Sequence, residues 1–445
     1  MRQAAFVRDK MTKSQLPQWT HRISSTRGAS HGGSTVIRLF ILALSGIWLL
    51  YSSASALAEE HERALAEETI PALAEECAAP CAGYEATAEL QNDWIFGAHP
   101  SFLRSNVLFP KFELDLFYAP TDYLRFVSAI VTEPVVDPEP GEDAAFQGIG
   151  TYVGELYALT KVDPLTVRAG KFDTVFSLAS EALPGIHAPD LASVFDADER
   201  LGGEAVVGFE GFGLNHALAA TVFTTDRTFL SESLFTNRGR LALADGGAGN
   251  TTGLSSFSVT LDGCKGAEKG DCYKDGEFGY RLGIRYQKPG LAVDTGEEEE
   301  EEEEEPLPGT GNELAYLAAA TGSFDLNGNT LRLLGESAYL KHFDGGPDDA
   351  LLLTGSVALE VQPMTYIATY THQRNFVADG PDTREQLADF EVIYASGEEE
   401  DAPSGAAKWN LGAAYTFAEN AEDERTHTFS VRATLQFGGH VKLGR

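Results

Sequence analysis

Long apolar segments are nearly absent from this 445-residue chain. One uncharged apolar run stands out, the 13 residues from Leu39 to Tyr51, whereas a helix needs about 20 such residues to cross a bilayer. No second run approaches that length. Outside this run, the chain is therefore either soluble or crosses a membrane as β-strands.

Basic residues are also few. The chain has 33 Lys and Arg against 67 Asp and Glu, a formal net charge of −34. Such an acidic chain repels phosphate, which argues against nucleic acid as a partner. The sequence has no H-E-x-x-H zinc motif, no G-x-x-x-x-G-K-[ST] phosphate-binding loop and no paired C-x₂-C. We therefore predict a protein that is not an enzyme and that uses no cofactor and no metal.

The basic residues gather at the start of the chain. Residues 1–58 hold seven Lys/Arg and one acidic residue, so the remainder carries a net charge of −40. Arg38 precedes the apolar run, and Ala56-Leu57-Ala58 fits an A-x-A cleavage site before Glu59. We predict that 1–58 is a signal peptide and leader, with Met11 an alternative start. A buried helix or a signal anchor is the alternative.

Four cysteines follow the predicted cleavage site: Cys77, Cys81, Cys264 and Cys272. An even number of cysteines in an exported chain indicates disulfides. Three connectivities are possible, of which the most local joins Cys77 to Cys81 and Cys264 to Cys272. The C-x₃-C spacing at 77–81 is also compatible with a metal site, although no His lies close by in the sequence.

From residue 84 onward, apolar and polar residues alternate. In 428–437, for example, Phe429, Val431 and Leu435 interleave with Ser430, Arg432 and Thr434. Alternation gives a β-strand one apolar and one polar face. The apolar face would form the core of a soluble sandwich, or would face lipid in a transmembrane barrel whose polar face lines water.

The length and spacing of the strands favour the barrel. Sixteen candidate strands are found at 86–96, 106–118, 123–133, 149–159, 164–174, 201–211, 214–224, 254–262, 277–287, 312–324, 329–340, 350–361, 364–374, 387–396, 408–417 and 426–437. Most are as long as a tilted membrane strand, which has about 9–11 residues, and short and long connections alternate. We predict an all-β, transmembrane, antiparallel up-and-down β-barrel of about 16 strands at 84–437. A flexible Ala/Glu-rich segment at 59–83 would precede it, and a C-terminal tail at 438–445 would follow.

Several segments of this region resemble a Gram-negative outer-membrane porin-like β-barrel family: "ELQNDWIF", "LFPKFELDLFY", "GELYALTKVDPLTVRAGKFD" and "FTNRGRLALADGGAGN". The last strand, ending at Phe437, looks like the signal that the barrel-assembly machinery reads, but eight further residues follow it here. The resemblance implies a protein of the cell outer membrane that passes small polar solutes or ions. Its partners would be lipid, the assembly machinery and, in a homotrimer, copies of itself.

The resemblance also implies that the third long loop, 175–200, folds into the barrel and narrows it. This loop carries Glu181, Asp190, Asp196 and Asp198, while alternation puts Arg125, Arg168, Arg281, Arg285, Arg332 and Arg432 on the polar face. Acids that face arginines across a constriction would create a transverse field, which favours polar solutes. Glu113, Asp115, Glu133, Glu155, Glu204, Glu210 and Glu336 share the polar face, and this excess of acid predicts a mild cation preference. The alternative is a solvated surface loop with scattered lumen arginines.

Three other interpretations remain open at this point: a barrel that conducts little and serves a structural or adhesive role, a soluble β-protein, and an outer-membrane enzyme. The nearest candidates for catalysis are His216 with Ser255 or Ser256. The acidic runs Glu297–Glu305 and Glu398–Asp401 are typical of low-complexity loops without a specific ligand, although divalent cations could bind the longer one.

Overall fold

The computed structural model describes residues 77–443, except 184, 244, 266–276, 291–310, 379 and 397–406. The predicted leader, most of the Ala/Glu-rich segment, Cys272 and both acidic runs lie outside the described residues. Among the described residues, no helix is long and apolar enough to cross a membrane.

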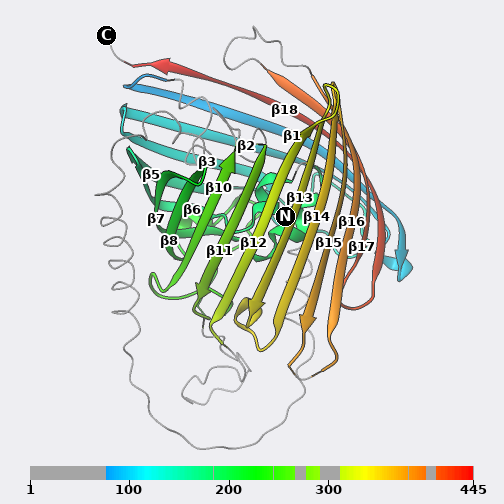
Figure 1. Cartoon of the computed structure of the whole chain (residues 1–445). Helices are drawn as coiled ribbons and strands as arrows, with labels where there is room; N and C mark the ends of the chain where they lie inside the picture. Colours follow the sequence, from blue (N-terminus) through cyan, green and yellow to red (C-terminus); the bar gives the residue numbers. More distant parts are fainter. Residues whose placement is uncertain are drawn as a thin grey trace, which may run out of the picture.

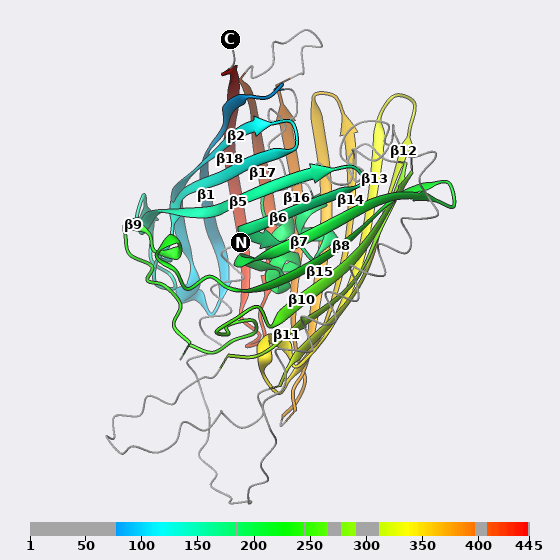
Figure 2. The same ribbon diagram turned by 90° about the vertical axis from the view of Figure 1, so that its left-hand side faces the viewer.

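Sixteen long strands form one antiparallel sheet that closes on itself (Figures 1 and 2). Each long strand pairs with its neighbours in sequence, and β1 pairs with both β2 and β18. The predicted sixteen-stranded antiparallel barrel is thus confirmed. The long strands are β1 (Cys81–His99), β2 (Ser105–Thr121), β3 (Leu124–Pro134), β5 (Ile149–Val162), β6 (Leu165–Thr174), β7 (Ala197–Gly211), β8 (Leu214–Thr225), β10 (Ser256–Lys265), β11 (Phe278–Gln287), β12 (Glu313–Asp325), β13 (Thr330–Lys341), β14 (Asp349–Val361), β15 (Met364–Phe376), β16 (Thr383–Ala395), β17 (Lys408–Glu419) and β18 (Arg425–Lys442). Two short strands, β4 (Ala144–Ala145) and β9 (Leu234–Phe235), lie in loops.

The barrel is apolar outside and polar inside. In β11, Phe278 and Leu282 are 42% and 48% exposed, whereas Arg281 and Arg285 are 5% and 1% exposed. Because successive side chains of a strand point to opposite faces, the exposed face is the outer one. This is the reverse of a soluble protein, and it matches a barrel surrounded by lipid.

The connections differ between the two ends of the barrel. Tight turns join β2 to β3, β5 to β6, β7 to β8 and β14 to β15. In the β7–β8 turn, Phe212 and Gly213 have φ of 55° and 76°, the positive values that a two-residue turn needs to match the twist of its strands. The long loops 135–148, 175–196 and 226–255 lie at the opposite ends of their strands. This asymmetry is typical of outer-membrane barrels.

Two predicted boundaries are wrong at the closing seam. β1 begins at Cys81, inside the segment predicted as flexible, and β18 continues to Lys442, inside the predicted tail. The register runs from Cys81↔Lys442 without interruption to Ile95↔Thr428. Gly438 and Gly439 interrupt the side-chain alternation from which the strand end was predicted. The hydrogen bonds between strands are made by the backbone and need no side chain. The pairing of β1 with β18 that closes the barrel can therefore continue past these glycines and lengthen both strands.

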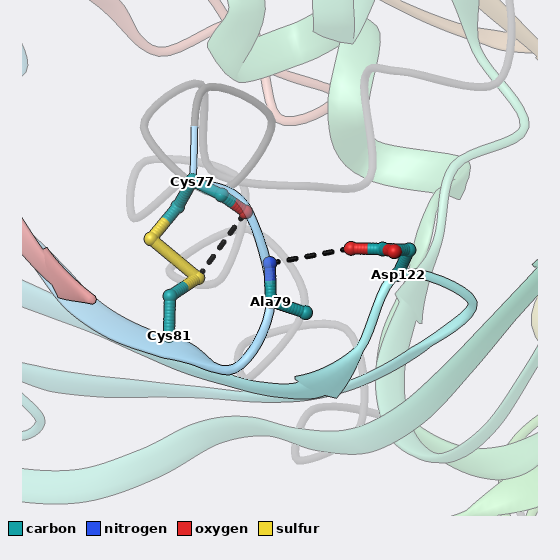
Figure 3. Close-up of a disulfide and its surroundings, with 4 residues drawn as sticks. All are labelled: Cys77, Ala79, Cys81 and Asp122. Carbon is teal, nitrogen blue, oxygen red and sulfur yellow. Dashed lines mark hydrogen bonds between the residues drawn. A yellow bond between two sulfur atoms is a disulfide. The ribbon is translucent and has the colours of Figure 1, made fainter. Parts of the chain in front are cut away.

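A disulfide between Cys77 and Cys81 lies at the start of β1 (Figure 3). Within this loop, the Ala79 amide donates a hydrogen bond to Asp122 Oδ1 at 3.2 Å. The disulfide loop is therefore tied to the β2–β3 turn next to it. Cys264 is disulfide-bonded as well, while Cys272 lies outside the described residues.

Part of the β5–β6 seam is completed by a loop. The β5–β6 pairing stops at Leu156↔Lys171, and β9 pairs with the open part of β5 through Gly150↔Phe235. Lys171 is buried beside this gap. Its Nζ lies 2.7 Å from Glu199 Oε2 and 3.1 Å from Asp226 Oδ2, and it donates to the Val153 carbonyl at 2.6 Å. The gap is therefore sealed by a buried ionic cluster.

Candidate pore and the loop across it

The loop between β6 and β7 folds into the barrel instead of standing outside it. It contains α5 (Leu178–Ala182), α6 (Ala188–Ala192) and η3 (Ser193–Phe195). These short helices, drawn in green, lie within the ring of strands in Figure 2. We call residues 175–196 the inner loop. Its contacts reach β1, β11, β13, β16 and β18, so it crosses the lumen from one wall to the other.

Glu336 anchors the near part of the inner loop to β13. Its carboxylate accepts hydrogen bonds from the hydroxyl of Ser177 at 2.7 Å and from the amides of Leu178 and Ala179 at 2.7 and 2.9 Å. Ser177 in turn caps α5 by accepting from the Ser180 amide. The start of α5 has no intrahelical partners for these amides. The wall carboxylate therefore satisfies them and fixes where the loop enters the lumen.

The far part of the inner loop is held by β16, β18 and β1. Glu391 Oε1 accepts from the amides of Ile186 and His187. The His187 ring lies 2.8 Å from Ser430 Oγ and 3.5 Å from Asp93 Oδ1. Arg432 also donates to the Gly185 carbonyl at 3.1 Å. Backbone groups of the loop are thus paired at both walls.

Two of the predicted arginines, Arg281 and Arg285, bind the inner loop to the wall of the barrel. Arg281 pairs with Asp262 on the neighbouring strand and with Glu181 of the inner loop, each at 2.7 Å. Arg285 pairs with Glu313 at 2.9 Å, donates to the Phe195 carbonyl, and lies 5.0 Å from the centre of the Phe176 ring. The charges of Arg281 and Glu181 are in direct contact. They hold the loop in place instead of facing each other across a gap.

The other predicted constriction residues are dispersed. Arg168 pairs with Glu204 at 2.8 Å and stacks 4.3 Å from the centre of the Phe172 ring, which places it in the β6–β7 wall. Arg125 lies on β3, and Asp198 is exposed at the start of β7. Asp190 lies in α6, and its side chain is outside the described residues.

Asp196 is the fourth predicted acid and serves the loop itself. Its Oδ1 accepts from the amides of Phe176 and Ser177 at 3.1 and 2.8 Å, and Ser180 donates to its second oxygen. Burial raises the pKa of Asp196 to about 7, against the lowering effect of these hydrogen bonds. Asp196 thus joins the two ends of the inner loop, and its carboxyl gains or loses a proton near neutral pH.

The raised pKa gives the inner loop a pH dependence of known sign. Between about pH 4 and about pH 7 the packed loop keeps a proton that an unfolded chain releases, so its packing is most stable at acid pH and weakens as pH rises to about 7. We expect current fluctuations in single channels to increase from about pH 4 to about pH 7 and to stay level above about pH 7. In Asp196→Asn this increase should vanish. If the variant keeps the wild-type pH profile, another group is responsible.

Sequence patterns did not identify Glu391 or Asp93 as partners of the loop, nor His187 as the loop residue that contacts them. Glu336 and Arg432 were placed on the polar face by alternation, but no pattern linked them to the loop. The proposed catalytic pair is not assembled. β8 pairs His216 with Gly263 and Phe223 with Ser256, so the ring and the Ser256 hydroxyl lie seven residues apart along the strand, about 23 Å.

No protein-family model and no curated protein sequence matches the chain. Solved structures of similar shape include OmpT, an outer membrane protein of Vibrio cholerae, at 11% identity and a TM-score of 0.43, over 81% of this chain and 97% of that one. The outer membrane channel DcaP of Acinetobacter baumannii matches at 8% identity and 0.46, over 82% and 99%. A BenF-like porin from Pseudomonas fluorescens Pf-5 matches at 9% identity and 0.43, over 82% and 100%.

At these identities and TM-scores, the similarity gives no information on the solutes of this protein. The class of the protein is instead inferred from the arrangement of its own strands. A closed antiparallel barrel leaves no edge unpaired, and its apolar outer face suits a bilayer. The chain is therefore a transmembrane β-barrel, whose closed, sixteen-stranded antiparallel sheet has the architecture of outer-membrane barrels. Its inner loop is bonded to β11 and β13 on one side of the lumen and to β1, β16 and β18 on the other.

Proposed function

We propose that the protein is a porin-like channel through which small polar solutes or ions diffuse passively, with a mild preference for cations. The observation that carries this proposal is the inner loop. A sixteen-stranded barrel is wide enough to enclose water. A loop bonded across it would restrict passage by size without chemistry, which is how a diffusion channel selects.

Charge supports the cation preference. A cavity on the long-loop side of the inner loop is lined by the acids Asp196, Glu313, Asp344, Asp348, Glu385 and Glu419, against Arg200 and Arg285. An acidic lining raises the local concentration of cations. Assembly as a homotrimer and recognition of the last strand by the assembly machinery stay predictions from the resemblance.

Ion current across a planar bilayer tests the proposal. Purified mature chain should insert in discrete, long-lived steps, and a salt gradient should give a reversal potential displaced toward that of the cation. Because Arg285 binds the inner loop to the wall, Arg285→Glu should loosen the loop and make the current steps larger and noisier. Arg374→Glu is a matched control, since its ion pair with Asp382 is exposed and Arg374 lies on the outer face of β15. Insertion without current would favour a structural or adhesive barrel.

A further inference from the structure

A cavity lies between the inner loop and the wall formed by β12, β15 and β16. Its volume is about 370 Å³, within the range of about 300–1,000 Å³ that is usual for small-molecule sites. We call this cavity the vestibule. Its polar side includes Gln287, Glu313, Gln373 and Glu385 together with Arg200 and Arg285, and its apolar side is formed by Leu191, Val194 and Phe195 of the inner loop together with Phe343, Pro347 and Val377.

Two amide side chains in the vestibule present buried oxygens with nothing to accept. Gln373 is 1% exposed and Gln287 is 4% exposed. Their nitrogens are committed, since Gln373 Nε2 donates to Asn375 Oδ1 at 2.7 Å and Gln287 Nε2 donates to Glu313 Oε1 at 2.8 Å. These bonds fix the orientation of both amides. Among the described residues, neither Oε1 has a hydrogen-bond donor, although buried polar atoms are normally paired.

Glu385 lies directly beside Gln373. The two are register partners on β15 and β16, so their Cβ atoms are about 5 Å apart on the same face of the sheet. Glu385 is 3% exposed and accepts a hydrogen bond from the neutral amide of Asn375 at 3.3 Å. Within the described part of the chain, no Lys, Arg or His lies within ion-pair distance of it. Glu313, by contrast, is neutralised by Arg285.

Arg200 and Arg285 line the β7 and β11 part of the vestibule, and Arg285 is already paired with Glu313. The β15 and β16 part instead presents two acceptors, Gln373 Oε1 and Glu385, and the inner loop adds an apolar face. We propose that it binds an organic cation, a primary ammonium or guanidinium group attached to a small apolar body. The cationic head donates to Gln373 Oε1 and to the Glu385 carboxylate, and the body packs on Val194, Phe195 and Phe343. This inference builds on the proposed channel, whose solutes would include such cations.

The test uses phenethylammonium as probe and the full-length barrel in detergent. Calorimetry should show saturable binding of phenethylammonium and none of 2-phenylethanol, which has the same body without the charge. In Glu385→Gln and in Gln373→Leu the dissociation constant should rise about tenfold or more, as expected for loss of a charge-assisted bond. Glu113→Gln, a lumen-facing glutamate on β2 outside the vestibule, should change it less than about twofold.

Planar-bilayer recordings separate this inference from the proposed function. Phenethylammonium added on the long-loop side should interrupt the current briefly, with shorter interruptions in Glu385→Gln. Calorimetric binding without any current would overturn the channel and leave the site standing. Current together with no binding, with equal binding of 2-phenylethanol, or with binding unaffected by Glu385→Gln, would overturn the site. Circular dichroism of each variant confirms that the barrel is folded.

Discussion

Replacement of residues 178–195 by two glycines is expected to raise single-channel conductance severalfold. The deleted segment contains α5, α6 and η3, the part of the inner loop that crosses the lumen. The ends can be joined without moving the strands, because Asp196 accepts a hydrogen bond from the Ser177 amide and Thr174 pairs with Ala197. A wider water-filled path conducts more ions. Planar-bilayer recording measures the effect directly.

Deletion of residues 138–142 provides the control. These residues belong to the long β3–β5 loop and are mostly exposed, so their removal should leave the conductance close to the wild-type value. An unchanged conductance in the inner-loop deletion would mean that this loop does not limit the current. The narrowest point of the path would then have to be sought elsewhere along the lumen.

Lys171→Ala is expected to lower the free energy of unfolding by about 3–5 kcal/mol, the usual cost of leaving buried charges without their partner. The side chains of Lys171 and Asp226 are both fully buried. Among the described residues, the one close cation that Glu199 would keep is Arg238, at 2.6 Å. The β5–β6 seam should therefore open first. Urea unfolding of the barrel refolded into lipid vesicles measures the change.

Two variants check that explanation. Lys265→Ala removes a lysine whose ion pair with Glu277 is 60–65% exposed, and it should cost less than about 1 kcal/mol. Asp226→Asn, combined with Lys171→Ala, removes one of the orphaned charges and should recover part of the lost stability. A double variant that is less stable than Lys171→Ala would contradict the proposed cause.

Local patterns predicted much of this barrel. All sixteen strands were located, and away from the closing seam their ends were placed within a few residues, because alternation is a property of neighbouring residues and continues through the whole strand. The loop that enters the lumen was also predicted, on the strength of the resemblance. The strand ends at the closing seam were missed, since Gly438 and Gly439 carry no side-chain signal.

The partners of the inner loop could not be predicted in the same way. Ser177 and Glu336 are 159 residues apart, and Gly185 and Arg432 are 247 apart. Alternation predicts that Glu336 and Arg432 face the lumen, but it does not predict which residues of the inner loop they contact. Lys171 shows the same limit. Its burial depends on a break in the β5–β6 pairing and on a loop from further along the chain.

The sequence by itself determined the class of structure: the alternation of apolar and polar residues, at strand length and with uneven connections, specifies a barrel with an apolar outside and a polar lumen. Only the tertiary structure decided what occupies that lumen. Closing the sheet brings β11, β13, β16 and β18 around the inner loop, and it places Gln373 and Glu385 against an apolar surface from a distant segment. Alternation fixes the face on which a residue lies, whereas the neighbour across the lumen is set by the closure of the whole ring.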